Sequence, residues 1–447
     1  MQAMTTQTPL LHADERYLVL GLGLSGLSAA RYLLARGYAV TVRDDRPEPP
    51  GLRPLREAFP EVSFTQGPLD TIAADEFDCL VVSPGLSVRH PALRRLAEQG
   101  KRIIGDIELF AEAADAPVIA ITGSNGKSTV TRLVGSIFEA AGVSAGVGGN
   151  IGTPALDLLG QGHALYVLEL SSFQLETTRS LRPLAATVLN ISEDHLDRYE
   201  DLADYRRTKL SLLETARIRV CNRDADNLPC TDRAHAFSLS DDTAAWHLID
   251  HKGETWLGHE RRPLLPVSAL KIQGHHNWSN ALAAMALAEA SGRIDERALI
   301  EGVTAFAGLP HRSEWLAEID GVLWINDSKG TNPGATRAAL EGLERPVILL
   351  AGGQGKGADM TVLVPALRQR ARAAILFGED APQMERVWAG ACALHRVEDL
   401  PQAVALAQRL ARPGDAVLLS PACASFDQYP NFAERGAHFR RLVEGLS

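Results

Sequence analysis

The segment Thr122–Thr129 has the residue types of a phosphate-binding loop. It reads TGSNGKST, follows an apolar run and precedes a helix-forming stretch, which is the setting that such a loop requires. Glycines let backbone N–H groups point at one anion, and the new helix adds its positive end. Lys127 would then reach the β- and γ-phosphates of a nucleotide, and Ser128 would offer a hydroxyl to Mg²⁺. The spacing is a variant, because only Gly123-x-x-Gly126 precedes the lysine, but a merely structural turn is the weaker interpretation.

A carboxylate that could hold a metal ion lies in the next apolar strand, within Tyr166–Ser172. A buried, unpaired carboxylate such as Glu169 is costly unless it binds a cation or hydrogen-bond donors. We therefore favour a metal role for Glu169 over the alternative, an exposed strand end.

The segment Asn190–Tyr199 places His195 among three carboxylates. Such a histidine can be a metal ligand, a base or a solvated loop residue, and the last interpretation is favoured when the segment is taken alone. Lys209 lies in an expected helix, Tyr205–Ala216, and alone it indicates a surface lysine.

The N-terminal glycines Gly21-Leu-Gly-Leu-Ser-Gly26 match G-x-G-x-x-G after a strand, and Asp44 ends the next strand. Alone, this pattern indicates a nicotinamide cofactor. The same turn can also hold another pyrophosphate at the start of a helix.

Three segments each run from an apolar strand through a glycine-rich turn into a helix: Arg16–Ala35, Pro117–Glu139 and Pro346–Leu367. Strand and helix alternation of this kind predicts α/β domains with parallel sheets. We place the domains at 1–105, 106–309 and 310–447, with a short helix at Asp106–Ala114 and a hinge near Pro310. Residues 222–266 are polar and turn-rich, and no role is assigned to them.

The composition narrows the class of protein. A net charge of −10 gives no basic footprint for nucleic acid or anionic lipid. The five cysteines form no CxxC pair, which favours reduced thiols over disulfides or a zinc site. The N-terminus lacks the pattern of a secretory signal, and no apolar stretch is long enough to span a bilayer. We therefore expect a cytoplasmic protein without nucleic-acid or membrane partners.

Taken together and in order, the motifs resemble the Mur ligase family, which also includes folylpolyglutamate synthases. They are Thr122–Thr129, Gly148–Gly152, Glu169–Gln174, Asn190–Tyr199, His276–Asn280, Leu309–Arg312, Asn326–Asn332 and Leu419–Asp427. The runs Asn326–Asn332, Gly352–Asp359 and Leu419–Asp427 are most similar to the branch of the family that adds D-glutamate.

The resemblance implies a three-domain α/β fold, with a Rossmann-like UDP-binding domain, a central P-loop ATPase-like domain and a Rossmann-like C-terminal domain that binds the amino acid. It implies ATP and Mg²⁺, with two ions and Mn²⁺ as a possible substitute. The substrates would be UDP-N-acetylmuramoyl-L-alanine and D-glutamate, joined through an acyl phosphate in peptidoglycan precursor synthesis by a monomeric enzyme.

The resemblance also assigns residues to roles. The catalytic residues would be Lys127, His195, Lys209 and Arg312, with Lys209 carbamylated. The nucleotide would contact Gly123, Ser124, Asn125, Gly126, Lys127, Ser128, Thr129, Asn277, Asn280, Arg312 and Asp327. The metal ions would contact Ser128, Glu169, His195 and Lys209. The two other substrates would contact Leu24, Ser25, Asp44, Asp45, Arg46, Ser83, Gly85, Asn150, Ser171, Gln174, Lys329, Thr331, Lys356, Ser425, Phe426 and Phe432.

Three alternatives stay open. An NAD-dependent oxidoreductase fused to an ATP-binding domain explains Gly21–Gly26 but leaves the C-terminal motifs unused. A sibling ligase, adding L-alanine, a diamino acid, a dipeptide or glutamate to folate, would differ only in its C-terminal pocket. A non-catalytic nucleotide-binding protein would show a broken catalytic set, and none is broken here.

Overall fold

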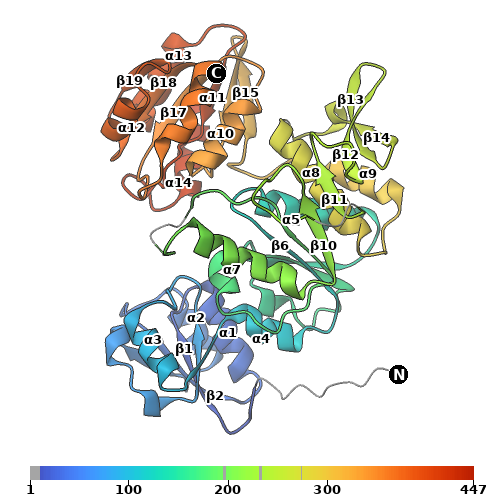
Figure 1. Ribbon diagram of the computed structural model, residues 1–447. Helices are drawn as coiled ribbons and strands as arrows, with labels where there is room; N and C mark the ends of the chain where they lie inside the picture. Colours follow the sequence, from blue (N-terminus) through green and yellow to red (C-terminus); the bar gives the residue numbers. More distant parts are fainter. Residues whose placement is uncertain (1–10, 195–197, 231–233, 273, 447) are drawn as a thin grey trace.

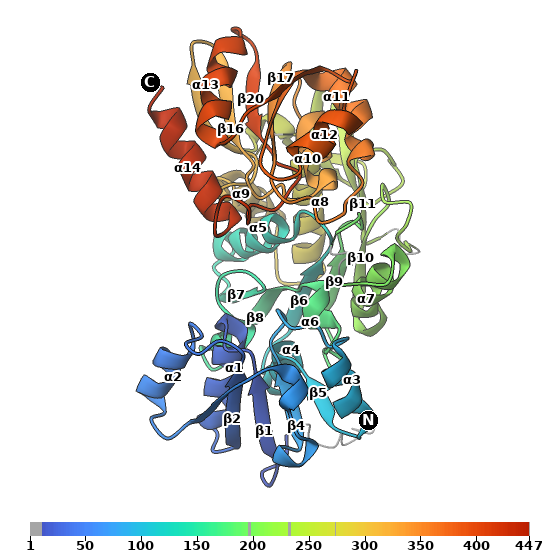
Figure 2. The same ribbon diagram turned by 90° about the vertical axis from the view of Figure 1, so that its left-hand side faces the viewer.

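A computed structural model describes residues 11–194, 198–230, 234–272 and 274–446. Three sheets of five, nine and six strands follow one another along the chain. Figure 1 shows them as three stacked lobes, with the N-terminal lobe in blue, the central lobe in green and yellow, and the C-terminal lobe in orange and red. The turned view in Figure 2 shows the same order of lobes.

The N-terminal lobe is a parallel sheet in the order β3-β2-β1-β4-β5. Its strands are β1 (Arg16–Leu20), β2 (Ala39–Asp44), β3 (Ser63–Gln66), β4 (Cys79–Val82) and β5 (Arg102–Ile104), and its helices are α1 (Leu24–Leu34), α2 (Leu52–Ala58) and α3 (Pro91–Glu98). Strands β1 and β4 lie at the centre and are almost wholly buried, as expected for continuous apolar runs covered on both faces.

The central lobe is built on the order β14-β13-β12-β11-β10-β9-β6-β8-β7, parallel from β7 to β12 and antiparallel from β12 to β14. Its strands are β6 (Val118–Thr122), β7 (Ala145–Gly149), β8 (Leu165–Glu169), β9 (Ala185–Val188), β10 (Ile218–Asn222), β11 (Ala236–Ser238), β12 (Trp246–His251), β13 (Glu254–His259) and β14 (Arg262–Pro266). Its helices are α4 (Asp106–Ala113), α5 (Lys127–Ala140), α6 (Ser172–Leu175), α7 (Leu202–Thr215), α8 (His275–Glu289) and α9 (Glu296–Ala305). Helix α5 packs against α8 and α9, whereas α7 packs against β9.

The C-terminal lobe has the order β15-β16-β20-β17-β18-β19, in which only the β15–β16 pair is antiparallel. Its strands are β15 (Glu314–Ile319), β16 (Val322–Asn326), β17 (Val347–Gly352), β18 (Ala371–Phe377), β19 (Ala393–Arg396) and β20 (Ala416–Leu419). Its helices are α10 (Pro333–Glu341), α11 (Val364–Arg370), α12 (Ala381–Val387), α13 (Leu400–Leu410) and α14 (Phe432–Glu444).

The predicted three-lobe α/β class is confirmed, and the domain limits drawn from the sequence stay a prediction. The expected helices at 106–114 and 205–216 are α4 and α7, the second of which begins three residues earlier. The unassigned residues 222–266 hold β11–β14, which extend the central sheet, and β12–β14 form the hairpins at the upper right of Figure 1. Strand β12, WHLIDH, is half-buried and mixed in polarity, so it has no continuous apolar run that would predict a strand.

One expectation about the cysteines is wrong. Cys221, in β10, and Cys230 form a disulfide, with their Cα atoms 5.5 Å apart. The chain turns back after β10, which brings two residues nine positions apart within the reach of a disulfide, a proximity that spacing alone does not reveal. Cys79, Cys392 and Cys423 are free thiols, as expected. Within the described part of the chain, no helix combines the length and the apolar character needed to cross a membrane.

Candidate active site

The phosphate loop leaves the buried strand β6 and enters α5 at Lys127. The backbone N–H groups of Ser124 and Asn125 donate to the carbonyl and side chain of Asn190, both at 2.9 Å. The Lys127 ammonium folds back onto its own loop and donates to the carbonyls of Gly123 and Ser124, each at 2.8 Å. Burial lowers the pKa of Lys127, which an arriving anion would reverse.

Glu169 ends strand β8 and is only 3% exposed, so the exposed-strand alternative is wrong. One of its carboxylate oxygens accepts from the Ser128 hydroxyl, and the other accepts from the Asn150 amide at 2.7 Å. A carboxylate and a hydroxyl thus lie together at the start of α5, and hard oxygen donors of this kind suit Mg²⁺. Among the residues that the structure describes, no three histidine, cysteine or acidic side chains form a preassembled metal cluster.

Lys209, on α7, is 1% exposed, so its interpretation as a surface lysine is wrong. Its ammonium donates to the Gly123 carbonyl at 2.8 Å, the same oxygen that Lys127 contacts. Burial first, and the charge of Lys127 second, lower the pKa of Lys209 well below its ordinary value. A buried amine held neutral is a nucleophile that can react with CO₂, so its environment fits the predicted carbamate.

Two residues from beyond the hinge reach the phosphate loop. The Arg312 guanidinium donates to the Ser128 hydroxyl at 2.6 Å. The Asn332 amide donates to the side chains of Asn125 at 3.2 Å and Asp194 at 3.4 Å. Asn332 was not predicted to make this contact, because an asparagine before Pro333 is typical of an ordinary helix cap, which it also is. His195 lies outside the described residues.

A cavity of about 630 Å³ brings together most of the residues predicted for phosphate, metal and D-glutamate. It is lined by the loop residues Ser124–Ser128, by Asn150, Glu169, Ser171 and Lys209 of the central lobe, and by Arg312, Lys329, Thr331, Lys356 and Phe432. The ammonium of Lys329 lies 4.0 Å from the centre of the Phe432 ring.

Gln174, Ser425 and Phe426 were predicted to contact a substrate, and they do not line this cavity. Gln174 is buried beneath it, where it caps α6 together with Ser171 and donates to Asp106. Ser425 is 3% exposed, whereas Phe426 is 61% exposed and faces the Lys356 ammonium at 5.5 Å.

A second cavity, of about 500 Å³, adjoins the first and shares Asn125, Gly126, Arg312 and Lys329 with it. It is lined by Thr129, His276, Asn277, Asn280 and Asp327, among others. The Asp327 carboxylate accepts from the Ser420 hydroxyl at 2.7 Å and from the Ser313 amide at 3.0 Å. Burial raises the pKa of Asp327 to about 6. His276 begins the motif His276–Asn280 and lines this cavity, although no role was predicted for it.

The predicted N-terminal substrate residues lie apart from both cavities. Leu24 is 74% exposed at the start of α1, next to Ser25, and the Ser83 hydroxyl donates to the Gly21 carbonyl. The Asp44 carboxylate accepts from the Leu22 amide at 2.7 Å and twice from the Arg46 guanidinium at 2.8 Å. Burial alone would raise the pKa of Asp44, but these hydrogen bonds outweigh burial and lower that pKa. Asp45 and Gly85 are both exposed in the same lobe, so a ligand held by this set would reach the central cavity only with its far end.

Comparisons with known families match each lobe in turn. Residues 15–105 match the Mur ligase MurD-like N-terminal domain, residues 121–288 the Mur ligase middle domain, and residues 311–423 the Mur ligase glutamate ligase domain. The N-terminal glycines thus belong to a MurD-like domain, which removes the support for an oxidoreductase.

Curated relatives extend the match to nearly the full chain. The chain is 48% identical over 442 residues to UDP-N-acetylmuramoylalanine–D-glutamate ligase of Methylococcus capsulatus, covering 98% of this chain and 96% of the relative. It is 49% identical over 455 residues to the ligase of the same name from Pseudomonas aeruginosa, covering 98% of this chain and all of the relative.

The fold agrees with solved structures. UDP-N-acetylmuramate–alanine ligase MurC of Thermotoga maritima aligns with a TM-score of 0.61 at 19% identity, over 97% of this chain and 100% of that structure. A pseudomurein peptide ligase type C from Methanothermus fervidus aligns with a TM-score of 0.62 at 17% identity, over the same shares. Family models for all three lobes, relatives of about half identical sequence and a shared fold agree, and the chain therefore belongs to the Mur ligase family.

Proposed function

We propose that this chain joins D-glutamate to UDP-N-acetylmuramoyl-L-alanine in an amide bond, with cleavage of ATP to ADP and phosphate. One observation carries the proposal. A single cavity holds the phosphate loop, the buried Lys209 and the C-terminal residues Lys329, Thr331 and Lys356, in a chain whose curated relatives bear that ligase's name.

In the first step, a carboxylate oxygen of the nucleotide sugar attacks the γ-phosphorus of ATP, and ADP leaves. Negative charge gathers on the transferring phosphoryl group, so positioned cations lower the barrier. Lys127 and Arg312 supply that charge from two lobes, and both contact the loop that would hold the phosphates. The adenine and ribose would lie in the adjoining cavity beside Asn277, Asn280 and Asp327.

The oxygen donors around the loop fit Mg²⁺, which when bound would neutralise phosphate charge. Glu169 and Ser128 would hold one ion, and the predicted second ion would take His195 and a carbamate on Lys209. Carbamylation replaces a buried amine with an anionic oxygen donor, and it gives the neighbouring Lys127 an opposite charge. We expect Mn²⁺ to substitute for Mg²⁺.

In the second step, the D-glutamate amine attacks the carbonyl of the acyl phosphate, and phosphate leaves. A dicarboxylic amino acid needs cationic and hydrogen-bonding partners. Lys329, Thr331 and Lys356 offer these from the C-terminal side of the cavity, and Phe432 packs beside Lys329. Phe426 lies beside Lys356, whereas Ser425 is buried. Asn150 and Ser171 face the same cavity from the central lobe, and the N-terminal lobe would hold the UDP group.

The experiment that tests this function is phosphate release from ATP with UDP-N-acetylmuramoyl-L-alanine and a panel of amines: D-glutamate, L-glutamate, L-alanine, L-lysine and D-alanyl-D-alanine. We expect release that requires both the nucleotide sugar and D-glutamate. Release with another amine would move the chain to a sibling ligase, and no release with any pair would overturn the catalytic assignment.

A further inference from the structure

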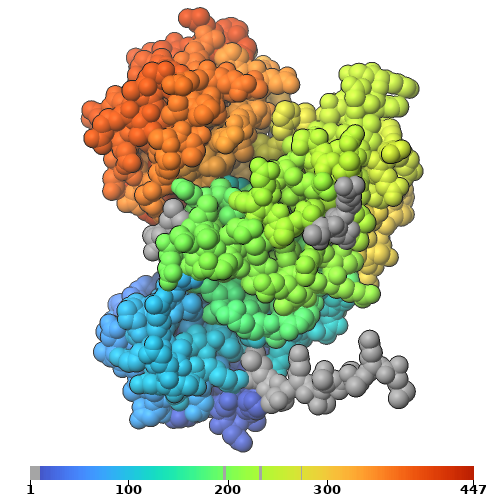
Figure 3. Space-filling model, in the orientation of Figure 1, coloured from blue at the N-terminus to red at the C-terminus, as the bar shows by residue number. Residues whose placement is uncertain are grey.

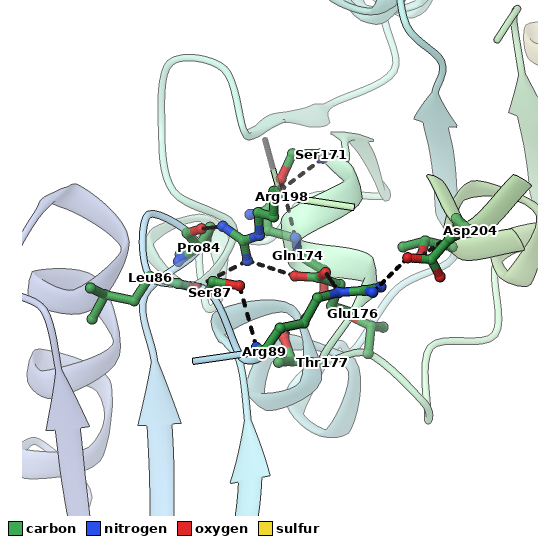
Figure 4. Close-up of polar contacts among 12 residues, drawn as sticks. Pro84, Leu86, Ser87, Arg89, Ser171, Gln174, Glu176, Thr177, Arg198 and Asp204 are labelled. Atoms are coloured by element: carbon green, nitrogen blue, oxygen red, sulfur yellow. Dashed lines mark hydrogen bonds and ion pairs between the residues drawn. The ribbon is translucent and has the colours of Figure 1, made fainter. Parts of the chain in front are cut away.

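A buried ionic cluster lies at the boundary between the N-terminal and central lobes, outside both cavities. It consists of Arg89, Glu176, Arg198 and Asp204, which we call the boundary cluster. Figure 4 shows the two guanidinium groups meeting at Glu176. The side chains of Glu176 and Arg198 are 4% and 8% exposed, and the two arginines balance the two carboxylates.

Arg198 connects the two lobes through two hydrogen bonds and makes a third within its own lobe. Its guanidinium donates to the carbonyls of Pro84 at 2.7 Å and Leu86 at 3.0 Å, in the loop that follows Ser83. It also donates to the Glu176 carboxylate at 2.6 Å and stacks on the Phe173 ring at 3.8 Å. A planar group with partners on several sides fixes both distance and orientation, which a lysine cannot reproduce.

Arg89 carries the connection to α7. From the N-terminal lobe it donates to Glu176 at 3.2 Å and pairs with Asp204 in the first turn of α7. Burial alone would raise the pKa of Asp204, but the hydrogen bond from Arg89 outweighs burial and lowers that pKa, so this carboxylate stays charged.

The energetics favour a positioning role for the boundary cluster. Removing charges from water is costly, so a buried ion pair is weak evidence for added stability. The directed hydrogen bonds of the boundary cluster do, however, fix the relative positions of the chain segments that carry its side chains. An exposed pair such as Arg53–Glu57, with side chains 91% and 65% exposed, fixes nothing comparable.

Contacts lead from the boundary cluster to the phosphate loop. Tyr205 follows Asp204 on α7, and its hydroxyl lies 3.2 Å from the Ser124 hydroxyl. Lys209 lies one turn further along α7, with its ammonium 4.7 Å from the centre of the Tyr205 ring. The helix that carries Lys209 is therefore held at its first turn by an arginine of the N-terminal lobe.

We propose that Arg198, Glu176 and Arg89 are positioning residues for acyl-phosphate formation. They hold the loop after Ser83 in register with α7 and the phosphate loop, so that a nucleotide sugar bound to the N-terminal lobe presents its carboxylate to the γ-phosphate. This inference rests on the proposed function and adds the residues that align its two halves.

The test uses Glu176→Gln and Arg198→Lys in the full chain, with Arg53→Gln as the matched control. Turnover is normalised to ADP-binding sites, so that unfolded protein does not count. We expect kcat to fall about 10- to 100-fold in both cluster variants, because a displacement of about 1 Å between reacting groups has effects of that order. The KM for ATP should stay within twofold, because the nucleotide contacts are intact, and Arg53→Gln should behave as the unmodified protein.

A kcat within twofold of the unmodified protein in both cluster variants would overturn the inference. A rise in the KM for ATP that matches the fall in kcat/KM would also overturn it, because that pattern indicates a damaged nucleotide site. If either variant does not fold, Arg89→Lys at the more exposed edge of the cluster, 23% exposed, gives the same comparison. Inactivity of the unmodified protein and of Arg53→Gln would instead contradict the proposed function.

Discussion

Two lysines, Lys127 and Lys209, donate to one carbonyl oxygen, that of Gly123, in a buried site. Burial and the charge of Lys127 hold Lys209 toward its neutral form, which favours carbamylation. We predict that Lys209→Ala loses about 100- to 1000-fold in kcat, the usual range when one electrostatic group is removed from a site. Short-chain carboxylic acids should partly restore turnover by replacing the carbamate. Full activity of Lys209→Ala without added acid would contradict a role for the carbamate. The control Lys252→Asn, at an exposed lysine, should turn over normally with or without the acid.

Lys329 lines both cavities, and burial together with the charges of Arg312 and Lys127 lowers its pKa to about 8. The free protein thus loses this proton as pH rises through about 8, whereas a bound triphosphate favours the charged form. We predict proton uptake when a non-hydrolysable ATP analogue binds at pH 8 to 9, measured calorimetrically in buffers of different ionisation enthalpy. Lys329→Arg should bind with less uptake, because arginine stays charged. Equal uptake in the two proteins would rule out Lys329 as the source.

At the scale of the element, helix α5 offers a matched pair of glycines. Gly126, before its first turn, has φ of 83°, and a Cβ there would lie 2.5 Å from the Asn280 side-chain oxygen. Gly142, after its last turn, has φ of 68° and open space around it.

Replacing either glycine by alanine should lower the free energy of unfolding by about 1 kcal/mol, because alanine is strained at positive φ. Only Gly126→Ala should also weaken ATP-analogue binding, since it displaces Asn280. Chemical denaturation and calorimetric titration separate the two effects. Equal nucleotide affinity in both variants would show that the loop does not depend on this close approach.

The βα units were predictable because buried parallel strands are continuous apolar runs, as in β6 and β17. Strands β11–β14 were not, because they are short or half-buried and mix polar with apolar residues. In the site, the residue types identified the phosphate loop between β6 and α5, and the single carboxylate in an apolar strand identified Glu169 at the end of β8.

The burial of Lys209 and the boundary cluster could not be read from local sequence. Arg198 meets Glu176 across 22 residues and Leu86 across 112 residues, and an arginine in a charged segment looks like a solvated side chain. Contacts of this kind exist only after the lobes have packed, so no local pattern reports them. The roles of individual site residues stay predictions.

The whole molecule consists of three lobes, which Figure 3 shows as three adjoining masses. The central lobe carries the phosphate loop, while Arg312 and Lys329 reach its cavities from beyond the hinge. A site built from two lobes is complete only when they are closed upon each other.

Replacing Arg312 therefore tests what the C-terminal lobe contributes to the site. We predict that Arg312→Ala lowers the rate of acyl-phosphate formation more than the affinity for ATP, because its charge matters most in the transition state. Rapid-quench kinetics and nucleotide titration give the two quantities. Arg396→Ala, on a half-exposed arginine of the same lobe, is the control. Normal turnover in Arg312→Ala would contradict the assignment.

We propose that the substrate's carboxylate becomes an acyl phosphate before D-glutamate attacks. The most direct measurement uses UDP-N-acetylmuramoyl-L-alanine labelled with ¹⁸O in its free carboxylate, and follows the released phosphate and the product by mass spectrometry. One carboxylate oxygen bonds to the γ-phosphorus and leaves with it, so we predict one ¹⁸O in each phosphate and D-glutamate in the product. Unlabelled phosphate accompanying the same product would contradict it.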